Sequence, residues 1–175
     1  MSTTTIEDQL TELGRRADRL DALAGEIAEN PRIRRHVRAI RRQEAAALTA
    51  LRETPDAVDE KLGQLKTRLA VAELSLAADI SDDWATFAEA VEEELRSWDI
   101  HLERLQATAA TRPWKARKQA EAAIADLRNH RLAVDLRLGA ARAAALEVWQ
   151  EQRRSVETAR DELARSADEL TTTLN

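Results

Sequence analysis

The chain has 175 residues, of which 43 % are hydrophobic and 34 % are charged, and its net charge is −5. Only 3 % of the residues are aromatic, and cysteine and tyrosine are absent, which excludes disulfides, thiolate chemistry and an aromatic-rich sheet core. Ala, Leu, Glu and Arg dominate, and all four are strong helix formers. We therefore expect one all-α domain with enough apolar residues to bury a core.

Apolar residues recur every three or four positions from the start of the chain. The first run is Ile6, Leu10, Leu13, Ala17, Leu20, Ala24 and Ile27. The spacing resumes after Asn30-Pro31, and two further runs cover residues 58–105 and 124–148. Spacing of this kind places one apolar stripe along each helix, as coiled-coil packing requires.

Proline residues mark the predicted helix boundaries. Thr54-Pro55-Asp56 is typical of an N-cap followed by a proline in the first helical position, and Thr111-Arg112-Pro113 marks another break. The predicted helices therefore span about 4–53, 55–110 and 113–172. Three helices of similar length predict an elongated antiparallel three-helix bundle with coiled-coil-type packing, which forms a single domain over residues 1–175.

Two places could alter this arrangement. Asn30-Pro31 predicts a kink or break in the first helix, and the segment Asp79–Asp83 interrupts the second helix at the same level of the bundle. The alternative is a true chain reversal at Asn30-Pro31, which would give a bundle of four or five shorter helices. The pattern also allows a dimer in which helices are exchanged, and it does not decide the oligomeric state.

No arrangement of residues predicts a catalytic, cofactor or metal site. Helix-borne metal sites use Glu three residues before His, but Ile33, Trp98 and Leu127 occupy those positions before the three histidines. Glycine-rich phosphate loops and nucleophile motifs are also missing. The acidic run Glu92-Glu93-Glu94 cannot converge on one ion, because consecutive helical residues point in different directions. We therefore expect a protein that is not an enzyme and has no cofactor.

An arginine-rich segment is the best functional candidate in the sequence. We call it the basic belt, and its members are Arg32, Arg34, Arg35, Arg38, Arg41 and Arg42. Residues 31–53 contain seven basic and two acidic residues, whereas residues 1–30 contain three basic and seven acidic ones. Such a belt can be a solvated face paired with neighbouring helices, a binding site for an anionic membrane or an acidic protein, or a contact for nucleic acid. The absence of interleaved aromatic residues and the acidic net charge disfavour nucleic acid.

Two of the four tryptophans are candidate anchors for a partner. Trp114 follows Pro113 at a predicted helix start, and Trp149 lies beside the apolar stripe at Val148. Tryptophan is enriched at binding hot spots. The alternative for both residues is ordinary packing, which is also what the spacing predicts for Trp84 and Trp98.

From about Leu62 onward the sequence resembles uncharacterised bacterial coiled-coil proteins rich in Ala, Arg and Glu. The segments that carry this resemblance are A-E-A-A-I-A-D-L-R-N-H-R, A-A-A-L-E-V-W-Q and A-R-D-E-L-A-R. Those proteins are similar in pattern to apolipoproteins and spectrin-type bundles, and some are associated with stress responses. The resemblance implies a helical bundle and identifies no functional residues. The preference for Arg over Lys, 23 against 4, also indicates a GC-rich bacterial genome.

These observations together predict a structural or protein-interaction bundle, which acts as a scaffold or spacer for a protein partner or for further copies of itself. The alternative is a peripheral protein that binds an anionic membrane surface or an acidic partner through the basic belt. The N-terminal residues MSTTTIEDQL lack the basic and apolar regions of a secretory signal, and no stretch approaches 18 apolar residues. We therefore expect a cytoplasmic protein. No small-molecule substrate is evident.

Overall fold

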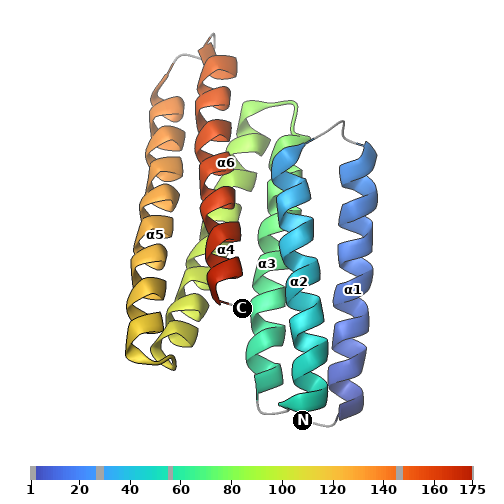
Figure 1. Cartoon of the computed structure of the whole chain (residues 1–175). Coiled ribbons are helices and arrows are strands. Elements are labelled where there is room, and N and C mark those ends of the chain that lie inside the picture. The colour runs from blue at the N-terminus through green and yellow to red at the C-terminus, as the bar shows by residue number, and fades with distance from the viewer. Residues whose placement is uncertain (1–2, 27–29, 55–56, 145–147, 175) are drawn as a thin grey trace.

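The computed structural model describes residues 3–26, 30–54, 57–144 and 148–174. Six helices occupy these ranges: α1 (Thr3–Glu26), α2 (Pro31–Glu53), α3 (Val58–Asp79), α4 (Trp84–Ala110), α5 (Trp114–Ala143) and α6 (Trp149–Leu174). Successive helices run in opposite directions, so the chain goes up and down along the length of the bundle (Figure 1). The all-α class predicted from the sequence is therefore confirmed for the described residues.

The predicted three-helix architecture is wrong. Each of the three long helices expected over 4–53, 55–110 and 113–172 is a hairpin of two antiparallel helices. The chain reverses at Asn30 and again between Asp79 and Trp84, where the sequence predicted a kink and a reversal was the alternative. The physical reason is that an apolar stripe has the same spacing whether the helix continues or turns back. A reversal brings the stripes of the two helices face to face, so the pattern survives it.

Side-chain caps stabilise two of these turns. The Asn30 side chain accepts hydrogen bonds from the backbone N–H groups two and three positions on, at 3.0 and 3.4 Å, and Pro31 occupies the first position of α2. Asp83 caps α4 in the same way by accepting from the Thr86 N–H at 2.9 Å. Such caps satisfy backbone donors that a helix start leaves without partners.

The helices form two lobes, each with its own apolar core. The first lobe consists of α1, α2 and α3, and its core runs from Leu10 on α1 to Leu76 on α3. The second lobe consists of α4, α5 and α6, whose core contains Phe87 and Trp98 and also takes in Val71 and Ala78 from α3. The lobes meet where α3 packs against α4 and α2 packs against α6. In Figure 1, α1 and α5 lie at the two outer sides of the molecule.

Leu102 provides a test of the second core. Its side chain is 3 % exposed, whereas Ile100, two residues away on the same helix, is 49 % exposed. The change Leu102→Asp buries an unpaired charge, and we expect it to lower the free energy of unfolding by roughly 3 kcal/mol or more. Ile100→Asp is the matched control and should leave stability nearly unchanged. Chemical denaturation of both variants checks this, and equal losses would contradict the placement of α4.

Candidate functional site

Polar residues are buried between the two lobes. The described residues of this kind are Arg32, His36, Gln43, Gln64, Thr67, Arg68, Ser75, Ser81, Glu94, His101, Thr108 and Arg160. They come from α2, α3, α4 and α6 and from the turn between α3 and α4, and none of those described belongs to α1 or α5. We call this interior the polar seam. The two apolar cores therefore flank a layer of charged and hydrogen-bonding groups.

Arg160 lies at the centre of one buried ion network in the seam. Its guanidinium donates to Glu94 Oε2 at 2.8 Å, to Asp79 Oδ1 at 2.8 Å and to the backbone oxygen of Ser75 at 3.0 Å. The Arg160 side chain is fully buried, and those of Asp79 and Glu94 are nearly so. Burial disfavours the charged guanidinium, but the neighbouring charges of Glu94 and Asp79 outweigh this effect and raise the pKa of Arg160 above its ordinary value.

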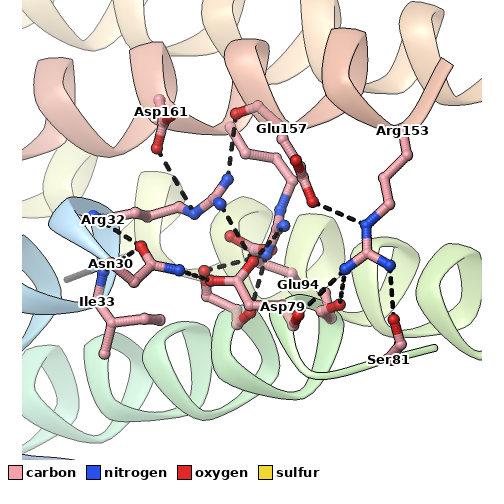
Figure 2. A network of polar contacts seen from close by, with 12 residues as sticks. Asn30, Arg32, Ile33, Asp79, Ser81, Glu94, Arg153, Glu157 and Asp161 are labelled. Atoms are coloured by element: carbon pink, nitrogen blue, oxygen red, sulfur yellow. Dashed lines mark hydrogen bonds and ion pairs between the residues drawn. The ribbon is translucent and has the colours of Figure 1, made fainter. Parts of the chain in front are cut away.

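Asp79 also receives two groups from the start of α2. Asn30 Nδ2 donates to Asp79 Oδ2 at 2.6 Å, and Arg32 Nη2 lies 3.1 Å from Asp79 Oδ1 (Figure 2). Arg32 Nη1 donates in addition to the backbone oxygen of Glu157 on α6, at 3.1 Å. Burial is the main influence on the Arg32 pKa and lowers it, and the charge of Arg160 acts in the same direction. One carboxylate therefore joins α3 to both α2 and α6.

Arg153 binds the backbone at the C-terminal end of α3. Its guanidinium donates to the backbone oxygens of Ser81 at 2.6 Å and Asp79 at 3.1 Å, and its Nε donates to Glu157 Oε1 at 2.8 Å (Figure 2). The same guanidinium lies 4.8 Å from the centre of the Phe87 ring. A cation at this place donates hydrogen bonds to carbonyl groups at the helix C-terminus, and it is attracted by the negative end of the helix dipole.

A second cluster in the seam combines one arginine, two histidines and a tryptophan. The Arg68 guanidinium lies 4.9 Å from the centre of the Trp98 ring, and His36 and His101 lie 6.2 and 5.7 Å from that ring. Thr67 Oγ1 is 3.2 Å from His101 Nδ1. The Arg68 guanidinium forms no hydrogen bond with a described residue. It contacts the face of an aromatic ring instead, which is a weaker form of compensation.

Burial is the main cause of three pKa shifts in this cluster. It lowers the pKa of His101 to about 3 and that of His36 well below its usual value, and the charge of Arg68 contributes to both shifts. It also lowers the pKa of Arg68 to about 10, against the attraction of Asp168. Arg68 is therefore a cation near neutral pH, whereas the two histidines are neutral.

The structure divides the basic belt into two groups of three. Arg32, Arg41 and Arg42 are paired within the chain; their carboxylate partners include Asp79, Asp161, Asp18, Glu44 and Asp168. Arg34 and Arg38 are exposed and Arg35 is partly exposed, and none of these three forms an ion pair with a described residue. Half of the predicted belt therefore takes part in internal packing, and the other half faces outward.

The two candidate anchor tryptophans lie in different environments. Trp114 is 70 % exposed, and Lys118 Nζ lies 4.6 Å from the centre of its ring. Trp149 is partly buried, with its ring 6.5 Å from the ring of Trp84 and 5.7 Å from the Arg153 guanidinium. Trp149 therefore packs beside Trp84 at the start of α4, whereas Trp114 projects from the start of α5.

Sequence reasoning did not find the seam, although a signal for it was present. Glu94 occurs three positions after Val91 and four before Trp98, and Arg160 occurs four after Val156 and three before Leu163. A charged residue at a position with apolar spacing points into the core. The neighbouring Glu92 and Glu93 conceal this signal, because within an acidic run the position of Glu94 on the inner face of α4 is not apparent.

Neither a membrane span nor a metal site occurs in the parts of the chain that the structure describes. None of the helices there contains an apolar stretch long enough to cross a bilayer. Within the same ranges, histidine, aspartate and glutamate side chains form no group of three or more that could hold a metal ion. His130, the remaining histidine, lines an open groove between α5 and α6 together with Asp126 and Glu162.

Comparison with known proteins adds no candidate function. We found no matching family model, no matching curated protein and no matching solved structure. The resemblance to Ala/Arg/Glu-rich bacterial coiled-coil proteins therefore stays a prediction.

Arg160→Met tests whether the ion network holds the lobes together. Removal of Arg160 leaves the buried Glu94 carboxylate without its cation and leaves Asp79 with Arg32 alone, and we expect the free energy of unfolding to fall by about 3–5 kcal/mol. Adding Asp79→Asn and Glu94→Gln to the same protein should recover part of this loss. The surface pair of Arg117 and Glu121 is the control, because an exposed pair contributes about 1 kcal/mol or less. An equally mild effect of Arg160→Met in chemical denaturation would contradict the network.

The buried histidines predict a loss of stability in mild acid. The unfolded chain binds protons on His36 and His101 near pH 6.5, but the folded chain does not, because their pKa values are lowered. Stability from this source is complete above pH 6.5 and is lost as the pH falls. The loss for His101 is about 2 kcal/mol between pH 7 and pH 5, and His36 adds a loss of the same sign.

Denaturation of His36→Gln/His101→Gln at several pH values should show a smaller slope than the parent, and His130→Gln should keep the parent slope. Nuclear magnetic resonance of the parent protein provides a second measurement that does not depend on the variants. Histidine signals of His36 and His101 that titrate between pH 5 and pH 7 would show that these rings are not buried as described.

Proposed function

We propose that this chain is a non-enzymatic interaction bundle that presents the outer face of α2 to an acidic, elongated segment of a partner protein. The observation that carries the proposal is the group of Arg34, Arg35 and Arg38, which face outward without an ion pair to a described residue. The other belt arginines within residues 32–42 are paired within the chain. Three cations at one place on a helix, none of which has an ion pair with a described residue, are available for an external carboxylate.

The spacing of these arginines suits a ligand that lies along the helix. Arg34 and Arg38 are four positions apart, so they lie one above the other at roughly 6 Å along the helix axis. Arg35 lies on the neighbouring side of the same turn. Guanidinium groups bind carboxylates in a two-pronged geometry, which gives orientation as well as attraction. A strand or helix that carries acidic residues would meet this row with successive side chains.

The surroundings of α2 favour a narrow partner over a flat one. α2 packs against α1 and α6. α1 contains six acidic and three basic residues, and α6 contains six acidic and four basic residues. A flat anionic surface brought to α2 would also approach these helices, within the roughly 8–10 Å over which charges act in physiological salt. An elongated segment can lie on α2 and avoid that repulsion.

One observation favours an anionic membrane as a second candidate. Trp114 is largely exposed at the start of α5, where Lys115, Arg117 and Lys118 follow it within one turn. Tryptophan beside basic residues is typical of protein segments that lie at the membrane–water interface. This site is on the second lobe and does not use the basic belt, so the two candidates can be separated by mutation.

Binding of a labelled oligoglutamate peptide tests the first candidate. Arg34→Glu/Arg38→Glu should weaken binding at least about tenfold in fluorescence anisotropy at low salt, because it removes two attractions and adds two repulsions. Arg15→Glu/Arg19→Glu is the matched control, with the same spacing, the same change of charge and exposed side chains on α1. The control should change affinity by about twofold or less, and both variants should keep the parent melting temperature.

Two outcomes would overturn the proposal. Equal losses of affinity in the two double variants would show that net charge alone attracts the peptide. No binding of the peptide to the parent would remove the acidic-partner interpretation. Flotation with phosphatidylserine-containing vesicles then tests the second candidate: binding that Trp114→Ala abolishes and Arg34→Glu/Arg38→Glu retains would support the membrane.

A further inference from the structure

A hollow of about 560 Å³ lies at the end of the bundle where the α2–α3 and α4–α5 turns come together. Thr54 and Arg112 from these two turns both line it, although the three-helix architecture would have put them at opposite ends. Four alanines form a large part of its lining, three of them from the second half of α2. Side chains this small leave open space beside the helix, so the hollow is a consequence of the alanine-rich segment 45–50.

The rim of the hollow is basic. Arg42, Lys61 and Arg112 line it together with the hydroxyl-bearing residues Thr49 and Thr54, and its described lining includes no aspartate or glutamate. Arg42 is held in place by an ion pair with Asp168, which lies outside the lining. Cations around a concave surface concentrate positive potential there and attract anions. The hydroxyl groups can donate hydrogen bonds to the same anion.

We propose that this hollow binds a small organic phosphate monoester. A phosphate monoester carries between one and two negative charges near neutral pH and offers three acceptor oxygens, which suits several cations and hydroxyl donors better than a single carboxylate does. The phosphate contacts Lys61, and Arg42 and Arg112, which also interact within the chain, add positive charge to the same rim. The carbon part of the ligand contacts the alanine surface of α2. This site does not depend on the proposed function, because the partner segment lies on Arg34, Arg35 and Arg38 in the first half of α2.

Isothermal titration calorimetry of the full chain tests the site with phenyl phosphate and inorganic phosphate as probes. Phenyl phosphate should bind more tightly than inorganic phosphate, and phenol should not bind measurably. Lys61→Gln should weaken phenyl phosphate binding about tenfold, because it removes a hydrogen bond to a charged group. Lys66→Gln is the control: Lys66 is an exposed lysine on the same helix, and it donates to Gln9 on α1 instead of lining the hollow.

Thr49→Leu provides a second variant that blocks the hollow. Thr49 is exposed, so the larger side chain fills the space without disturbing the core, and the binding of phenyl phosphate should be lost while the melting temperature is retained. Arg34→Glu/Arg38→Glu should keep phosphate binding, which separates this proposal from the preceding one. Equal weakening by Lys61→Gln and Lys66→Gln, or unchanged binding in Thr49→Leu, would overturn the site. The site would also be overturned if sodium sulfate at equal ionic strength gave the same heats of binding as phenyl phosphate.

Discussion

The arrangement of the lobes depends on the buried contact of Arg160 with Asp79 and Glu94. This one guanidinium joins α6 to α3 and α4, and through Asp79 it is linked to Asn30 and Arg32 on the α2 side. A buried ion pair adds little net stability compared with apolar packing, but a misaligned one is very unfavourable. The apolar cores can tolerate small shifts between helices, whereas the network cannot. We infer that the cores supply most of the stability and the network sets the register.

The sequence predicted the helix ends better than the arrangement of the helices. Asn30-Pro31 and Pro113 lie at the starts of α2 and α5, because proline and an N-cap residue act on the local backbone regardless of tertiary structure, whereas Pro55 and Asp56 lie outside the described residues. The reversal between α5 and α6 was missed, since no proline or glycine lies between Ala143 and Trp149. Whether a stripe continues or turns back is decided by distant packing, and spacing alone does not contain that information.

A repeated tetrapeptide shows more clearly that local sequence does not decide where a residue lies in the folded protein. The tetrapeptide Arg-Leu-Ala-Val occurs at residues 68–71 on α3 and again at residues 131–134 on α5. Both valines are fully buried in one core, but the two arginines differ. Arg131 reaches Asp99 at 2.8 Å and Asp135 at 3.4 Å near the surface, whereas Arg68 is buried against Trp98. Identical local sequences therefore have different roles, because α3 packs against the other lobe through α4 and α5 lies at the outside.

The position of α6 in the chain has a consequence for folding. Most helix contacts join neighbours along the chain, such as α3 with α4 and α5 with α6, and contacts of this local kind form rapidly. The contact between α2 and α6 is different, because Arg32 and Glu157 are 125 positions apart. During synthesis, five helices leave the ribosome before Arg160 does. Until then Asp79 and Glu94 lack that cation, so the two lobes acquire their final alignment only when the last helix is complete.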